Sequence, residues 1–341
     1  MKSRFGGQPA RRGPLVVVLL LGLGLALAPV VFQMFDRAPK GGDMIDAFEP
    51  YMTPAKITQF EGYMAEMRAA RTEFDQQIRP DLQSALGVDA AGIDTRFVPL
   101  SSFDRQWPKL DSDMSDMLRK MRRNIGNYEA VAALPPFPLF PWFFVIPGLL
   151  IAGLAAWGLR DARKGKASRV AVIAIVVFGL GVVAAPAIFQ MFERAPKGAD
   201  MINDFRSLMT DKKLRTIQGY FVTLAAGEGN VRTAALPALE VAAPAGQLPA
   251  PASERFPAVT RWGEDWPTIF REFAPMVGVM SDNVVNFEAV DALPPFSMFP
   301  WFFVIPGLTI AGAGVLAGLP RRADDTGTTT EHTTEHTTKE T

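Results

Sequence analysis

Four long runs of apolar residues interrupt an otherwise mixed chain of 341 residues. They cover 15–35, 139–159, 170–192 and 298–318, and none of them contains Asp, Glu, Lys or Arg. A helix needs about 20 apolar residues to cross the hydrocarbon core of a bilayer. A buried helix of a soluble protein is as apolar but is rarely as long. The pattern therefore predicts an all-α integral membrane protein with four transmembrane helices.

Two polar segments, 36–138 and 193–297, separate the first run from the second and the third from the fourth. In both segments apolar residues recur every three or four positions, which is the period of an amphipathic helix. Thr53-Pro54 is a good helix start and Gly87 a good stop, so we predict a helix from about 54 to 86. The stripe from Leu110 to Tyr128 predicts a second helix that returns to the membrane.

The chain contains an internal duplication. Residues 32–45 match 189–202 at 12 of 14 positions, with an offset of 157. Residues 134–149 match 293–308 at 14 of 16 positions, with an offset of 159. Each unit has two spans, so both units have the same orientation and form parallel tandem repeats. One amphipathic hairpin cannot bury its stripe alone, so we expect the two hairpins to pack as one pseudo-twofold helical bundle.

The two duplicated motifs lie where the polar segments meet the membrane. In FQMF-[DE]-RAPKG, an aromatic collar is followed by an acid, a base and an expected Pro–Gly break. In LPPFxxFPWFFVIPG, tryptophan suits the headgroup layer, and the last proline is placed to kink the span. We favour structural anchors over the alternative, a gating or ligand groove at this junction. The predicted junction residues are Phe32, Phe35, Pro39, Trp142, Pro147, Phe189, Phe192, Pro196, Trp301 and Pro306.

Basic residues indicate the orientation of the spans. The segments 1–14, 160–169 and 319–341 all fall on one side, and basic residues predominate next to the spans there. The positive-inside rule makes this side cytoplasmic, with both termini inside and the two polar segments outside. The Ala-, Gly-, Val-, Arg- and Pro-rich composition is typical of a high-GC bacterial genome. We therefore expect a multi-pass protein of the bacterial plasma membrane.

The two polar segments differ between their helices. Residues 225–260 are rich in Ala, Pro and Gly, which predicts a loop or an extended excursion there. The matching stretch of the first segment keeps a helical pattern. Divergence of this kind is expected when one copy has acquired or lost a contact.

The residue types give little support for catalysis. Cysteine is absent, and the only histidines, His332 and His336, lie in the polar tail, which we expect to be disordered. The closest acid pairs, Asp111/Asp113 and Glu264/Asp265, fall near predicted helix starts, where acids usually serve the helix dipole. No catalytic residue, cofactor or metal site is therefore predicted.

Methionine is the one residue type that leaves a metal site open. Thioether sulfurs spaced three or four residues apart on a helix can bind Cu(I). Core packing explains them better, because methionine fills irregular gaps and falls on the apolar stripes in any case. The weak candidates are Met64, Met67, Met114, Met117 and Met121.

The organisation of the chain favours a non-enzymatic membrane protein whose exterior helices bind a partner protein or an envelope component. The alternative is an extracytoplasmic sensor or ligand-binding subunit that signals through a separate output protein. Its paired spans with exterior helices broadly resemble the four-helix chemosensory domains of bacteria, in architecture and without shared motifs. An exterior enzyme ranks third. The lipid bilayer and a membrane or envelope protein are the expected partners, and the zero net charge gives no reason to expect nucleic acid.

Overall fold

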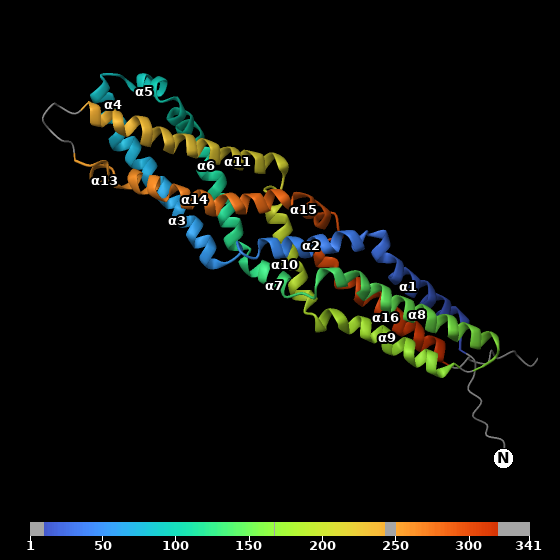
Figure 1. Ribbon diagram of the computed structural model, residues 1–341. Coiled ribbons are helices and arrows are strands. Elements are labelled where there is room, and N and C mark those ends of the chain that lie inside the picture. The colour runs from blue at the N-terminus through green and yellow to red at the C-terminus, as the bar shows by residue number, and fades with distance from the viewer. Residues whose placement is uncertain (1–9, 167, 243–249, 320–341) are drawn as a thin grey trace, which may run out of the picture.

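The computed structural model describes residues 10–166, 168–242 and 250–319, and every regular element within these ranges is helical. The molecule is elongated, with three layers along its length (Figure 1). The apolar bundle at one end comprises α1 (Arg12–Val31), α8 (Phe140–Arg163), α9 (Arg169–Ile188) and α16 (Trp301–Gly318). The waist comprises α2 (Met34–Phe48), α7 (Ile125–Ala132), α10 (Met191–Phe205), α15 (Val284–Asp291) and the short 3₁₀ turns η2 (Phe137–Leu139) and η4 (Phe296–Met298).

The distal bundle forms the other end of the molecule (Figure 1). From the N-terminal half, 12–163, it contains α3 (Pro54–Glu73), the π-helical η1 (Phe74–Ile78), α4 (Arg79–Leu86), α5 (Ala90–Arg96) and α6 (Val98–Arg123). From the C-terminal half, 169–318, it contains α11 (Asp211–Asn230), the π-helical η3 (Val231–Ala235), α12 (Leu236–Val241), α13 (Ala252–Arg255) and α14 (Pro257–Asp282).

The four helices of the apolar bundle are long and apolar enough to cross a membrane, which confirms the prediction of four candidate spans. Helix α1 packs against α8 and α16, and α9 packs against the same two helices. Helices α1 and α8 approach each other closely at Gly148, where an added Cβ would lie 2.6 Å from Ala26 N and 2.7 Å from Gly22 O. Small residues that allow backbones to approach are the usual basis of helix packing in lipid.

The two helices that lead into the waist end four residues earlier than predicted, at Val31 and Ile188. Gln33 and Gln190 then adopt the left-handed conformation, with φ of 54° and 53°. The predicted spans 15–35 and 170–192 therefore include the starts of α2 and α10.

The prediction of a Pro–Gly break at the end of the FQMF-[DE]-RAPKG motif is wrong. Pro39 and Pro196 lie inside α2 and α10, which continue to Phe48 and Phe205. A left-handed residue redirects the whole chain, whereas a proline inside a helix removes a single hydrogen bond from the ladder.

The predicted helix from 54 to 86 is confirmed in its start and its end. Thr53 Oγ1 accepts a hydrogen bond from Lys56 N at 3.2 Å, and Gly87 takes the left-handed conformation with φ of 65°. The π-helical η1 shifts the register within this continuous run. The buried positions Phe74, Ile78 and Leu82 accordingly recur every four residues.

The prediction of a loop over 225–260 is wrong for 225–241, and also for the last part, which contains α13 and the start of α14 at Pro257; residues 243–249 lie outside the described residues. Helix continues through α11 and η3 to the end of α12 at Val241. Val231, Ala235 and Leu239 are buried at the same four-residue spacing as in the N-terminal half. Pro237 falls in the first turn of α12, where proline is tolerated. Apolar spacing therefore outweighs the Ala, Pro and Gly composition here.

The helices of the distal bundle pack across the two halves. Helix α3 packs against α14, and α11 packs against α6. The rings of Phe60 and Phe273, both fully buried, have centroids 4.4 Å apart. Buried residues of α3 and α11 belong to one hydrophobic cluster: Phe60, Met64, Met67, Ile217, Tyr220 and Phe221.

Candidate functional site

The waist is the candidate site, because it contains most of the first duplicated motif and the start of the second, and joins the apolar bundle to the distal bundle. One face of α2 buries Met34, Ala38, Gly41 and Ile45, at helical spacings of four, three and four. The equivalent face of α10 buries Met191, Ala195, Gly198 and Ile202. Helix α2 packs against α15, and α10 packs against α7, so each half supports the other at this level.

Two arginines of the duplicated motif connect the halves. Arg37 on α2 donates to the backbone oxygen of Ala292 at 2.9 Å. Arg194, the equivalent residue on α10, donates to the oxygen of Ala133 at 2.5 Å. Each acceptor directly precedes the LPP sequence of the other half. One duplicated motif therefore holds the other in place across the molecule.

A cavity of about 50 Å³ lies where the waist meets the distal bundle, and we call it the axial chamber. Six lining residues come from each half and occupy equivalent positions in the duplication. The lining residues are Met44, Ile45, Phe48, Met52, Met121, Tyr128, Met201, Ile202, Phe205, Met209, Met280 and Phe287.

Two further cavities of about 20 Å³ each lie in the waist. The first shares Met44, Ile45, Met201 and Ile202 with the axial chamber. The second shares a different set with the first, Leu134, Phe137, Ala195 and Phe296. These common walls place the three cavities in a series, which we call the axial column. It ends at Phe140 and Phe299, next to the apolar bundle.

The lining of the axial column is apolar. None of its lining residues in the described part of the chain carries a charge. The hydroxyl of Tyr128 is the one side-chain polar group, and it donates to the backbone oxygen of Ile45 at 2.6 Å. Burial, with smaller contributions from Glu49 and Asp46, raises the pKa of Tyr128 to about 12. The tyrosine therefore stays neutral, and the column offers dispersion contacts to a ligand rather than charge.

The aromatic residues predicted at the junction form a collar around the waist. Phe35 meets Trp142 edge-on with ring centroids 5.5 Å apart, and Phe192 meets Trp301 in the same way at 5.8 Å. All four of these side chains are exposed. Phe32 contacts Phe302 at 6.1 Å, and Phe189 contacts Phe143 at 5.4 Å.

None of the predicted junction residues lines the axial column. Pro147 and Pro306 lie within α8 and α16, and Pro39 and Pro196 lie within the waist helices. The sequence did carry a signal for the column. Met34, Ala38, Gly41 and Met44 share one helical face, and the second copy of the motif has the same residue types at the equivalent positions.

The methionines that were considered as weak metal ligands are all buried in the hydrophobic core. Met121 is the one that lines the axial chamber; Met64, Met67, Met114 and Met117 do not. Among the described residues, no group of three or more His, Cys, Asp or Glu side chains could hold a metal ion. His332 and His336 lie outside the described residues.

The prediction that the acid pairs lie near helix starts is wrong. Asp111 and Asp113 lie in the middle of α6, and Glu264 and Asp265 lie inside α14, because both helices start earlier than their stripes suggested. Asp113 binds Lys213 of the other half at 2.8 Å and accepts from Tyr220 at 2.6 Å.

The surroundings of these acids determine their protonation. Burial alone would raise the pKa of Asp113, but hydrogen bonds from Lys213, Tyr220 and Lys109 outweigh it and lower the pKa to about 2. Burial raises the pKa of Glu66 on α3, with Asp265 adding to the effect and Arg261 opposing it. Asp113 therefore serves as a fixed charge between the halves, a structural role.

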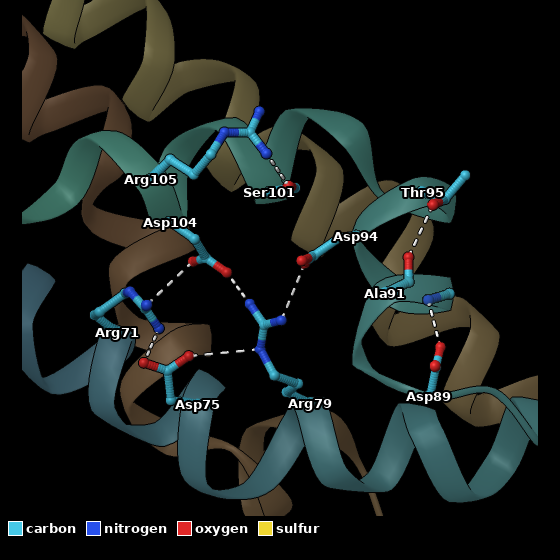
Figure 2. Close-up of polar contacts among 11 residues, drawn as sticks. Arg71, Asp75, Arg79, Asp89, Ala91, Asp94, Thr95, Ser101, Asp104 and Arg105 are labelled. Atoms are coloured by element: carbon cyan, nitrogen blue, oxygen red, sulfur yellow. Dashed lines mark hydrogen bonds and ion pairs between the residues drawn. The ribbon is translucent and has the colours of Figure 1, made fainter.

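The distal tip of the N-terminal half contains a network of ion pairs (Figure 2). Arg79 pairs with Asp75, Asp94 and Asp104, and Arg71 pairs with Asp75 and Asp104. The network connects α3, η1, α4, α5 and α6. The positions equivalent to Arg79 and Asp104 are Leu236 and Gly263, so the C-terminal half cannot form it. What remains there is one pair, Glu228 with Arg232 at 3.0 Å.

A scan against protein-family models finds no match for this chain, and a search of curated proteins finds no similar sequence.

Proposed function

We propose that this protein is a non-enzymatic, multi-pass protein of the bacterial plasma membrane that binds a partner protein or an envelope component. Its four spans form two parallel tandem units, with both termini and the 160–169 loop in the cytoplasm. The distal bundle projects outside as a pseudo-twofold pair of hairpins. The charge asymmetry of the sequence and the packing of α3 on α14 and α6 on α11 support this arrangement.

The observation that carries the proposal is a difference between equivalent positions on the outer surface of the distal bundle. In the N-terminal half, Asp111 pairs with Arg68 at 2.7 Å. In the C-terminal half, these positions hold Phe270 and Ala225. The Phe270 side chain is 46% exposed and adjoins the rings of Phe221 and Trp266. We infer that this exposed ring contacts a partner, because aromatic side chains are enriched in protein interfaces relative to the rest of the surface.

Site-specific photocrosslinking tests this proposal. A photoreactive phenylalanine analogue is placed at position 270 in the full chain, in cells, and at position 111 as the matched control. We expect a discrete crosslinked species from position 270 that the control lacks, at equal expression. Equal crosslinking from both positions, or none from position 270, would refute the proposal that the surface around Phe270 contacts a partner.

Cysteine labelling tests the orientation, because the chain contains no cysteine. Val98 and Val222 are both well exposed on the distal bundle. Cysteines at these positions should react with an impermeant maleimide added to intact spheroplasts. Reaction only after the membrane is permeabilised would reverse the proposed topology.

The axial column favours a second candidate, an extracytoplasmic sensor or ligand-binding subunit that acts through a separate output protein. A ligand in the waist would touch both halves and both bundles, so its binding could change how they pack. Co-purification in mild detergent separates the two candidates. A stoichiometric structural partner supports the first, and a kinase or transporter partner supports the second.

A further inference from the structure

The axial column is the feature of this molecule that points most directly to a ligand. Protein interiors are close-packed, and voids larger than a water molecule are few in any domain. Here three of them lie in series between equivalent residues of the two halves. Each of the three is lined by residues of both halves, so the series follows the boundary between them.

The walls of the column are built from flexible side chains. Eight of the chain's 15 methionines line it: Met34, Met44, Met52, Met121, Met191, Met201, Met209 and Met280. Methionine is unbranched and polarisable, so it adapts to an occupant at lower cost than branched side chains do. A core selected for rigidity would use Leu, Ile and Val at such positions.

The size of the cavities limits the shape of the occupant. The largest measures about 50 Å³, well below the roughly 150 Å³ of an engineered cavity that admits benzene. A fused ring system would not fit without unpacking the waist. A linear polymethylene chain can thread narrow spaces in series once the methionines move aside. The lining carries no charge, so it could not match a charged or strongly polar group.

The position of the column supplies the source of such a chain. Its lower end is lined by Phe140 and Phe299, which lie near the starts of the candidate spans Phe137–Arg163 and Phe296–Gly318. Below them, the rings of Phe144 and Phe303 lie 4.4 Å apart. The column therefore begins at the depth where the hydrocarbon layer of a surrounding bilayer meets the headgroups. We infer that it binds one long, unbranched acyl chain, from either a membrane phospholipid or a free fatty acid.

This inference does not depend on the partner surface at Phe270. It predicts that the full chain, in vesicles of phosphatidylglycerol and phosphatidylethanolamine, is labelled inside the column by a diazirine placed on a fatty-acyl tail. Crosslinked peptides should include α2 and α10 around Met44 and Met201. A phospholipid probe and a free fatty-acid probe are used in parallel, and the one that labels more strongly at equal concentration identifies the source.

Substitutions at Gly198 and Met201 should change labelling in opposite directions. A Cβ at Gly198 would lie 3.3 Å from Val131 and 3.7 Å from Phe296, so Gly198→Val fills the middle of the column. We expect it to reduce column labelling at least tenfold. Met201→Ala enlarges the chamber and should increase labelling. Gly62→Val is the matched control, because an added Cβ there meets nothing within 4 Å. Its labelling should equal that of the unmodified chain.

Folding is checked for every variant by size-exclusion profile, and Met201→Ala keeps the test valid if Gly198→Val fails to fold. Labelling confined to lipid-facing residues of the apolar bundle, and unchanged by Met201→Ala, would overturn the inference. So would stoichiometric binding of Cu(I) to the purified protein without tail labelling, since the methionines would then serve as metal ligands.

Discussion

The waist and the outer surface of the distal bundle differ in how closely the two halves of the chain resemble each other. In the waist, equivalent residues make equivalent contacts: Arg37 and Arg194 each reach a carbonyl of the opposite half. On the distal surface, equivalent positions hold different chemistry, such as Asp111 and Phe270. The two regions belong to one chain. They differ mainly in that waist residues contact the opposite half, whereas residues of the distal surface face outwards.

The difference indicates which contacts constrain the sequence. A residue at the boundary between the halves packs against the other half, as α2 does against α15, so a change in one copy must suit the other. A residue on the outer surface has no such counterpart. The distal tips show the same freedom, because Arg71 and Asp75 are replaced by Glu228 and Arg232, an ion pair of reversed polarity. A similar waist and a dissimilar outer surface are therefore expected of two related halves that pack against each other.

The largest effect is expected from Phe60→Asp in the shared core. An unpaired charge in this fully buried site should cost at least ~3 kcal/mol and loosen both halves of the distal bundle. Limited proteolysis in detergent measures this, with Ala65→Asp on the exposed face of α3 as control. Cleavage restricted to the N-terminal half would show that the halves fold independently.

Gly148→Val tests the packing of the apolar bundle. The new side chain would collide with the backbone of α1 at Ala26, which overpacking data put at about 1–3 kcal/mol. Gly307→Val, the equivalent change in the other half, should lower the melting temperature by a similar amount. Gly153→Val, where an added Cβ meets nothing within 4 Å, should change it little. A clear inequality between Gly148→Val and Gly307→Val would mean that the two spanning pairs are packed differently.

Asp113 should make stability depend on pH. Its pKa is about 2 in the folded protein and has its ordinary value, near 3.8, in the unfolded chain. The ionised form is therefore favoured by folding, and its contribution is present above pH ~4 and lost as pH falls towards 2. Asp113→Asn should lower the free energy of unfolding by at most ~2 kcal/mol at neutral pH, and this difference should disappear near pH 2. Thermal melts of both proteins across this range measure it, and a constant difference would contradict the assignment.

The smallest effects are expected from Arg37→Gln and Arg194→Gln. Each removes one exposed hydrogen bond to a carbonyl, which contributes about 1 kcal/mol. The two variants should shift the melting temperature equally, because the contacts are equivalent. A shift from one arginine alone would weaken the contrast between the waist and the distal surface.

Sequence patterns predicted the features that depend on local spacing. The four apolar runs and the helix start at Thr53 are local features, and all of them correspond to helices, although two of the runs extend four residues beyond the helix ends at Val31 and Ile188. The bend at Gln33 gave no such signal, because left-handed residues are usually Gly or Asn. The early start of α6 was hidden by Pro108, which suggests a boundary but lies inside the helix.

The candidate site was less accessible to sequence reasoning. Arg37 could be seen in its motif, but its acceptor lies 255 residues away. The axial column is defined by side chains from both halves and exists only once they pack. The identical methionines of the two motifs were the available clue, but a local pattern does not distinguish a filled core from a lined cavity.

Expression of residues 1–165 alone tests the central claim, that the two halves complete each other. Alone, this N-terminal half leaves the buried faces of α2, α3 and α6 without the helices of the other half. Burying one large apolar side chain contributes roughly 1.5–3 kcal/mol. The half-chain should therefore form a homodimer, in which a second copy replaces the missing half, or be degraded in the cell. Mass photometry in detergent, with quantitative blotting, distinguishes these outcomes. A half-chain that is abundant, folded and monomeric would contradict the account.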